Sequence, residues 1–104
     1  MVVSLLRRRT SLTDRQLWLS RVEALLPRLR PVLERQPGFL SVQHFLAADD
    51  AGDMVEVTTW ESPETCRDYA RNGGGALAAT ISDALLPTAD YPHGTWVRET
   101  YVIR

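Results

Sequence analysis

The chain alternates between two spacings of hydrophobic residues. Four short runs are rich in β-branched and aromatic residues, which is typical of strands. These runs predict strands over Met1–Arg9, Phe39–Ala47, Met54–Trp60 and Thr95–Ile103. Between them, apolar residues recur every three or four positions, which is the spacing of a helix that packs one face on a core.

The first helical stretch begins after Thr13 and Asp14, which are good N-cap residues. Pro27 and Pro31 lie inside it. Because proline lacks an amide donor and crowds the preceding turn, we expect a break near residue 26, with two shorter helices in place of one. The apolar stripe of this stretch is Trp18, Val22, Leu25, Leu26, Leu29 and Leu33.

The second helical stretch begins at Ser62–Glu64, which offers an N-cap, a proline at the first helical position and an acid near the positive helix end. The run Asn72–Gly75 interrupts it, since these residues readily adopt left-handed conformations. A further helix is predicted over Ala76–Leu86. The predicted apolar sides are Cys66, Tyr69 and Ala70 before the glycines, and Leu77, Ile81 and Leu85 after them.

The predicted order β-α-β-β-α-β is that of a ferredoxin-like α+β fold, a four-stranded antiparallel sheet with helices on one face. The second strand carries apolar residues on both faces, and a sheet with one wet face alternates more cleanly. We therefore expect another copy of the chain to cover the second face, which gives a homodimer. The two predicted faces of this strand are Leu40, Val42 and Leu46 on one side, and Phe39 and Phe45 on the other.

Composition narrows the class of protein. The 104 residues are expected to form a single domain over residues 1–104. The formal net charge is −1, with 12 basic and 13 acidic residues, which removes the electrostatic motive for nucleic-acid binding. Arg7–Arg9, the one basic cluster, is interpreted as a solvated strand end or an anion contact.

Localisation is inferred from features that the sequence lacks. It shows no secretory leader and no apolar run of membrane-spanning length, so we expect no membrane association. A single cysteine, Cys66, excludes an internal disulfide and a thiolate metal cage. We therefore expect a cytoplasmic protein, and a bacterial one because the sequence is rich in alanine, arginine and leucine and has no lysine.

Three segments, "QPGFLSV", "VEVTTWESPETCRDYA" and "GTWVRETYVIR", carry a resemblance to a known family. They are similar to the antibiotic biosynthesis monooxygenase group of the dimeric α+β barrel superfamily. The resemblance covers nearly the whole chain, and its most specific part is "WESPE". It implies a homodimer whose sheets form a barrel, with a pocket in each subunit between sheet and helices. Members include cofactor-free oxygenases of polycyclic phenols, haem-degrading enzymes, quinol-handling proteins and proteins with no known reaction.

The resemblance also points to individual residues. In the oxygenases and haem degraders, the tryptophan at this strand end lines the pocket, which nominates Trp60. Glu56 stands where oxygenases of aromatic polyketides have an asparagine. Tyr69 and Arg71 stand where haem degraders have an iron-ligating histidine, and Ser4 replaces the asparagine of their first strand. These departures weaken the haem interpretation.

Glu56, Thr58 and Trp60 alternate along one predicted strand and therefore share a face. If that face lines the pocket, Glu56 takes a proton from a phenol, with its pKa raised by burial. The alternative is an exposed glutamate at a strand edge. Thr58 is a substrate-binding candidate, and Trp60 is either a pocket wall or a core residue.

Three further residues are candidates on chemical grounds. His44, on an apolar strand face, is either a general base or a core histidine with satisfied hydrogen bonds. It has no second ligand at suitable spacing, so no metal site is expected. Tyr69 either orients a substrate oxygen or is a core tyrosine. Arg98 either holds an anionic substrate, pairs with Glu56 or forms a surface or dimer salt bridge.

Three functions remain open at this point. The first is a cofactor-independent monooxygenase acting on a small or polycyclic phenol or dihydroquinone, with molecular oxygen as co-substrate. Such a substrate, once deprotonated, passes an electron to oxygen itself, so the protein supplies a dry pocket, a base and an oriented phenolate. The second is a non-catalytic ligand-binding or cyclase-like protein of the same fold, and the third is a haem-binding degrader.

Overall fold

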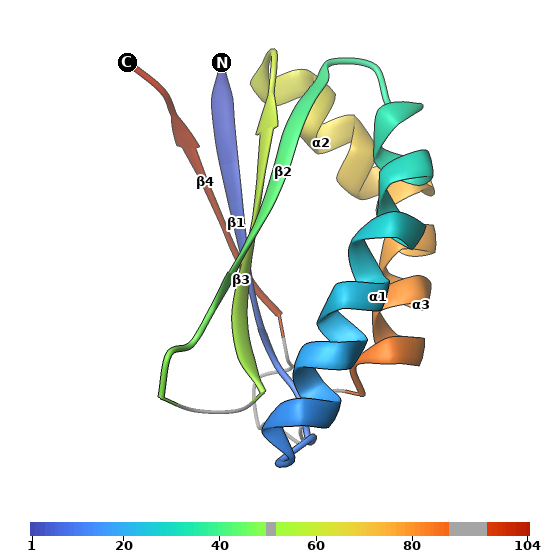
Figure 1. The fold of residues 1–104 in the computed structure, drawn as a ribbon. Helices are drawn as coiled ribbons and strands as arrows, with labels where there is room; N and C mark the ends of the chain where they lie inside the picture. Colours follow the sequence, from blue (N-terminus) through green and yellow to red (C-terminus); the bar gives the residue numbers. More distant parts are fainter. Residues whose placement is uncertain (50–51, 88–95) are drawn as a thin grey trace.

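The structure is a computed structural model that describes residues 1–49, 52–87 and 96–104. Residues 50–51 and residues 88–95, which include His93, lie outside these ranges. Figure 1 shows the arrangement of the elements. In chain order they are β1 (Val2–Arg9), α1 (Arg15–Glu34), β2 (Phe39–Leu46), β3 (Asp53–Trp60), α2 (Pro63–Arg71), α3 (Gly74–Leu85) and β4 (Trp96–Val102).

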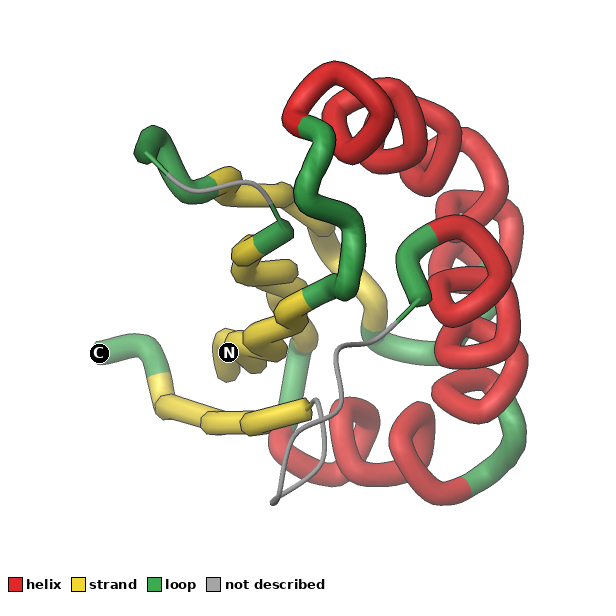
Figure 2. The backbone as a smooth tube through the Cα atoms, turned by 90° about the horizontal axis from the view of Figure 1, so that it is seen from below, coloured by secondary structure: helices red, strands yellow, loops and turns green. Residues whose placement is uncertain are grey.

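The strands form one antiparallel sheet in the order β2-β3-β1-β4. All three helices of the described residues lie on the same face of this sheet (Figures 1 and 2). The two chain ends meet at one end of the sheet, where the Ile103 amide donates to the Met1 carbonyl oxygen at 2.9 Å. The predicted ferredoxin-like α+β architecture is thereby confirmed.

Helix α1 is a single 20-residue helix, so the predicted break near residue 26 is wrong. Pro27 and Pro31 stand four residues apart, both exposed on the outer side of the helix. The carbonyl groups that lose an amide partner to these prolines can therefore bond to water, which lowers the cost of keeping the helix intact. Asp14 caps the helix as predicted, accepting hydrogen bonds from the amides of Gln16 and Leu17.

The α2–α3 segment follows the predicted capping chemistry but not all of the predicted faces. Ser62 and Thr65 form a capping box at the start of α2. Gly73, with φ 93°, makes the left-handed turn into α3. Ala70 is exposed and so is Leu77, so neither belongs to the apolar side on which we placed it. Leu85 is buried and Ile81 packs against the core, as predicted, and Ala78 and Ser82 are buried beside them.

A β-bulge at the start of β2 changes the faces that simple alternation predicted. The register between β2 and β3 shifts between Phe39 and Ser41. Phe39 therefore pairs with Trp60 and turns toward the helices, on the side of Val42, whereas alternation had placed it opposite. Because a bulge adds one residue to one strand, every side chain before it changes face.

The face of the sheet that points away from the helices is apolar. No element in the described part of the chain covers it (Figure 2). Phe45 and Tyr101 are each 52% exposed there, on the two edge strands. Valines and leucines of the two central strands lie between them, namely Val3, Leu5, Val55 and Val57. An exposed apolar surface of this kind marks an interaction site.

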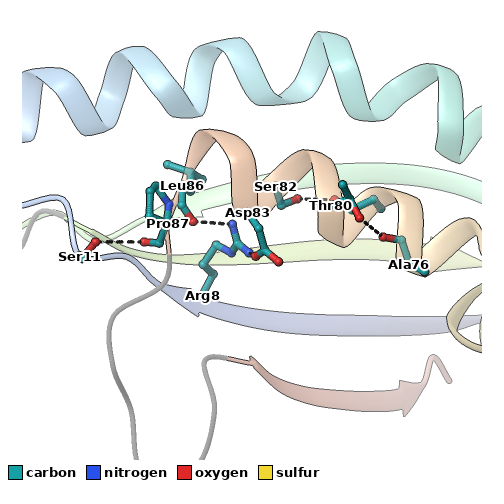
Figure 3. A network of polar contacts seen from close by, with 9 residues as sticks. Arg8, Ser11, Ala76, Thr80, Ser82, Asp83, Leu86 and Pro87 are labelled. Carbon is teal, nitrogen blue, oxygen red and sulfur yellow. Dashed lines mark hydrogen bonds and ion pairs between the residues drawn. The ribbon is translucent and has the colours of Figure 1, made fainter.

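Arg8 is buried, which corrects the interpretation of Arg7–Arg9 as a solvated strand end. Its side chain rises from β1 to the last turn of α3, where Nη1 donates to the Leu86 carbonyl oxygen at 2.8 Å (Figure 3). Nη2 pairs with Asp83. Burial lowers the pKa of Arg8, and the Asp83 carboxylate offsets part of that effect. A buried cation at the negative end of α3 fixes this helix above β1.

None of the helices in the described ranges has the length and apolar character needed to cross a membrane.

Candidate functional site

A cavity of about 220 Å³ lies between the sheet and the helix pair α2–α3. The sheet contributes Leu6 from β1, Glu56 from β3 and Arg98 from β4. The helices contribute Tyr69 from α2 and four small residues of α3, namely Gly75, Ala78, Ala79 and Ser82. Such a cavity, largely apolar with a few polar groups, is the usual form of a small-molecule site.

The small residues of α3 are the reason that the cavity exists, and the sequence analysis missed them. They recur at helical spacing, which places them on one face of α3 toward the sheet. The prediction chose the buried face from large apolar residues such as Leu77 and Ile81, and it therefore overlooked the small residues. The signal was present in "GGALAATIS", where small residues repeat every three or four positions. Gly75 also packs closely on α2, because an added Cβ would lie 3.0 Å from the Tyr69 carbonyl oxygen.

Glu56 and His44 form a hydrogen-bonded pair across β2 and β3. The His44 Nε2 atom lies 2.9 Å from Glu56 Oε1. The His44 side chain is only 8% exposed, and the Glu56 side chain is 15% exposed. The glutamate is therefore neither isolated nor at an exposed strand edge, and its second oxygen, Oε2, has no role in this pair. A carboxylate held in this way in an enclosed site is suited to take up a proton.

Tyr69 is the second polar group of the cavity wall. Burial and the nearby Glu56 carboxylate raise the pKa of its hydroxyl to about 12, while Arg98 acts in the opposite direction. The side chain therefore stays neutral near physiological pH and can donate a hydrogen bond. Within the described residues no protein group accepts that bond, so the hydroxyl is available to a ligand oxygen.

Arg98 is the third polar group, and it lies on the exposed rim of the cavity. A pair with Glu56, one of the three alternatives for Arg98, is not among the ion pairs of the described residues. Those pairs are Arg7–Asp53, Arg8–Asp83, Arg30–Glu34 and His44–Glu56. The Arg98 guanidinium thus remains available for an anionic group that enters the cavity.

Trp60 and Thr58 lie behind this wall. Trp60 is 0% exposed and packs between Phe39 and Tyr69, with its ring centroid 4.8 Å from that of Tyr69. Its indole Nε1 donates to Thr58 Oγ1 at 2.9 Å, so each satisfies the other. Neither residue is among those that line the cavity in the described part of the chain. Trp60 therefore supports the position of Tyr69.

The six predicted site residues thus separate into groups. Glu56, Tyr69 and Arg98 meet at one cavity, His44 contacts the first of them, and the Trp60–Thr58 pair packs beneath. Within the described ranges, no group of three or more histidine, cysteine, aspartate or glutamate residues is placed to hold a metal ion. Cys66 is buried.

The sequence profile of antibiotic biosynthesis monooxygenases matches residues 17–74, which is more than half of the chain. The chain belongs to the antibiotic biosynthesis monooxygenase family. The match includes β2, β3 and α2, and with them five of the six predicted site residues. Arg98 and most of α3 lie beyond it. No curated protein sequence matches the chain significantly.

Solved structures of family members share the fold. SnoaB, a cofactor-independent oxygenase from Streptomyces nogalater, superposes with a TM-score of 0.68 at 20% identity, covering 99% of this chain and 93% of SnoaB. A monooxygenase from the gene ActVA-Orf6 of Streptomyces coelicolor, solved with Nanaomycin D, gives 0.66 at 23% identity, covering 99% and 87%. At these identities the likeness establishes the fold of this antibiotic biosynthesis monooxygenase family member and not its substrate.

Proposed function

We propose that the protein is a cofactor-independent monooxygenase that oxidises a small phenol or dihydroquinone in the cavity beneath α3. One observation carries the proposal. Three polar groups converge on one cavity: the carboxylate of Glu56, the neutral hydroxyl of Tyr69 and the guanidinium of Arg98, which forms no ion pair within the described residues. The rest of the lining is small or apolar, apart from Ser82. Family membership supports monooxygenase chemistry, and the description of SnoaB as cofactor-independent supports the absence of a cofactor.

Each polar group has a distinct role in this proposal. Glu56 accepts the phenolic proton at Oε2, since Oε1 is bonded to His44. The Tyr69 hydroxyl donates to the resulting phenolate or to a second substrate oxygen. The Arg98 guanidinium offsets the negative charge of the phenolate. Trp60 acts through Tyr69, because it holds that ring in place and does not line the cavity.

The reaction balances without a cofactor. The phenolate passes one electron to oxygen, and the two radicals combine to form a carbon–oxygen bond. The peroxide anion formed in this way takes up one proton to become a hydroperoxide, and loss of water from the hydroperoxide leaves a quinone carbonyl. One oxygen atom thus enters the ring, the other leaves as water, and the substrate supplies all the electrons. The protein contributes deprotonation, orientation and exclusion of bulk water.

Oxygen uptake tests the proposal. Purified protein is mixed with a panel of one- to three-ring phenols, and oxygen consumption is followed with quinone formation under isotopically labelled oxygen. We expect one labelled atom per quinone. Because general-base catalysis contributes about 10²-fold or more, Glu56→Gln should lower the rate by at least that factor. Glu61→Gln, an exposed glutamate at the end of the same strand, is the matched control and should retain the full rate.

A phenol that binds but consumes no more oxygen than a protein-free blank would contradict the oxygenase proposal. That result would favour the second candidate, a ligand-binding or cyclase-like protein. The observation that favours this candidate is the shape of the site itself, since a small apolar cavity binds an aromatic ring whether or not oxygen reacts there.

We also propose that the protein works as a homodimer formed through the outer face of the sheet. This face presents Phe45 and Tyr101 to solvent with four aliphatic residues between them, which is a large apolar surface for a monomer. Sedimentation at micromolar concentration should give the mass of two chains. Val57→Asp, at the centre of the face, should shift the protein to a monomer, whereas Glu99→Gln on the same face should not. A monomeric parent protein would contradict the proposal.

A further inference from the structure

We propose that His44 is a proton-relay residue, which carries the proton accepted by Glu56 out of the cavity to a groove between β2 and α1. This inference rests on the proposed function, because it requires Glu56 to act as a base. It assigns a role to the His44–Glu56 pair beyond the orientation of the carboxylate. The argument depends on where the two side chains of the pair lie.

The pair joins two separate hollows of the molecule. Glu56 lines the cavity beneath α3, whereas His44 lines an open groove of about 510 Å³ between β2 and α1. The groove is formed with α1 residues that include Glu23 and Arg30. Glu56 belongs to the lining of the cavity and His44 to that of the groove, and His44 Nε2 lies 2.9 Å from Glu56 Oε1. This contact is therefore a direct polar route from cavity to groove within the described residues.

A route of this kind suits a closed site, because it keeps Glu56 in proton exchange with solvent while a ring is bound. A bound aromatic ring fills the cavity and separates the Glu56 carboxyl group from water on that side. The glutamate must nevertheless lose its proton before it can deprotonate another substrate molecule. His44 offers an exit that does not pass through the occupied cavity, and imidazole accepts and releases protons near neutral pH.

The transfer balances atom by atom. The substrate O–H bond breaks as a Glu56 O–H bond forms. That bond then breaks as His44 Nε2 gains the proton, which restores the carboxylate and gives an imidazolium. The imidazolium finally loses a proton to water in the groove. The net result is a phenolate in the cavity, an unchanged His44–Glu56 pair and one proton released into solvent.

The charges around the pair support transfer in this direction. On the cavity side, Arg98 stabilises the phenolate. The Arg8 guanidinium, which lies between β1 and α3, interacts electrostatically with the Glu56 carboxylate. On the groove side, Glu23 shares the lining with His44, and its carboxylate stabilises a transient imidazolium. Tyr69 stays neutral and does not compete for the proton.

Stopped-flow spectroscopy with a nitrophenol tests the relay without any oxygen chemistry. The probe is mixed anaerobically with protein at a pH at which the free nitrophenol is mostly neutral. Its absorbance reports ionisation in the cavity, and a pH indicator reports proton release to solvent. For the parent protein we expect both signals to rise together, at a rate independent of buffer concentration.

The informative variant is His44→Gln, whose amide can still bond to Glu56 Oε1 but cannot carry a proton. We expect its affinity for nitrophenol to stay within about twofold, while proton release becomes at least about tenfold slower. Added imidazole, which can enter the groove, should restore the rate. Arg30→Gln removes a charge from the same groove and is the matched control, with release within about twofold of the parent.

Each outcome decides the proposal. Unchanged release in His44→Gln overturns it, and so does slow release that imidazole does not restore, because that result indicates a structural role. Failure of the parent protein to ionise the bound probe overturns it as well. If the parent ionises the probe through His44 but consumes no oxygen with any phenol, the relay stands and the oxygenase proposal fails.

Discussion

The two halves of the layer between sheet and helices are built from different side chains. Beneath α1, large residues fill the space, including Trp18, Leu25, Leu29 and Leu33, which are almost completely buried. Beneath α3, four residues no larger than serine line the cavity of about 220 Å³. Both helices lie over the same sheet at comparable positions in the fold (Figure 1).

The difference shows how one fold separates stability from function. The half beneath α1 supplies most of the buried apolar surface, and hydrophobic burial is the main favourable contribution to folding. The half beneath α3 buries less apolar surface, and its small side chains leave a space of the size of a ligand. It is held in place by polar contacts at its ends, among them the buried Arg8 beneath the last turn of α3.

The largest effect is expected from creating a second cavity in the filled half. Leu29→Ala should lower the free energy of unfolding by about 2–5 kcal/mol, because the surrounding core relaxes only in part around a deleted buried side chain. Urea denaturation measures the change. Leu17→Ala, at an exposed position of the same helix, is the control and should cost less than about 1 kcal/mol. Equal effects at the two positions would contradict the comparison.

The next effect concerns Tyr69, at the boundary of the two halves. Its pKa is about 12 in the folded protein against an ordinary value of 10.0, so the unfolded chain loses this proton first as the pH rises. Stability is therefore complete below pH 10 and falls by about 2–3 kcal/mol as the pH approaches 12. Denaturation at a series of alkaline pH values measures this loss. Tyr69→Phe should remove that component, and an identical pH dependence in the variant would refute the assignment.

The smallest effect is expected from filling the hollow half. Ala79→Leu places a large side chain in the cavity and should weaken binding of a phenol at least tenfold, or about 1.4 kcal/mol, as measured by calorimetry. The cost in stability should stay near 1 kcal/mol, since the new side chain occupies existing space. Ala76→Leu changes an exposed position of the same helix and should leave binding unaltered. Equal binding by Ala79→Leu and the parent would show that the ligand lies elsewhere.

The sequence alone predicted the elements whose signals are local. Capping at Asp14 and Ser62, the glycine turn before α3 and the strand periodicities follow from the chemistry of neighbouring residues. The ferredoxin-like order followed from these elements and from the resemblance to the family. The same alternation placed Glu56 on one face with Trp60, which the sheet register confirms.

Features that depend on packing could not be predicted in this way. The cost of the prolines in α1 depends on whether the carbonyl groups that lose a partner can reach water, and exposure is a tertiary property. The bulge that turns Phe39 inward depends on the partner strand. The predicted face of α3 was right for Ile81 and Leu85 and wrong for Leu77, because packing turned the small residues Ala78 and Ser82 toward the sheet and left Leu77 exposed.

The candidate site shows the same division. Local pattern was enough to nominate Glu56, Tyr69 and His44 as chemically capable residues, because their side-chain chemistry does not depend on the fold. Only the tertiary structure decided that Glu56 and Tyr69 share a cavity, that His44 opens on a different groove, and that Trp60 is buried behind them. These relations join residues on separate strands and helices, and space between such elements is set by the sum of the side chains that fill it.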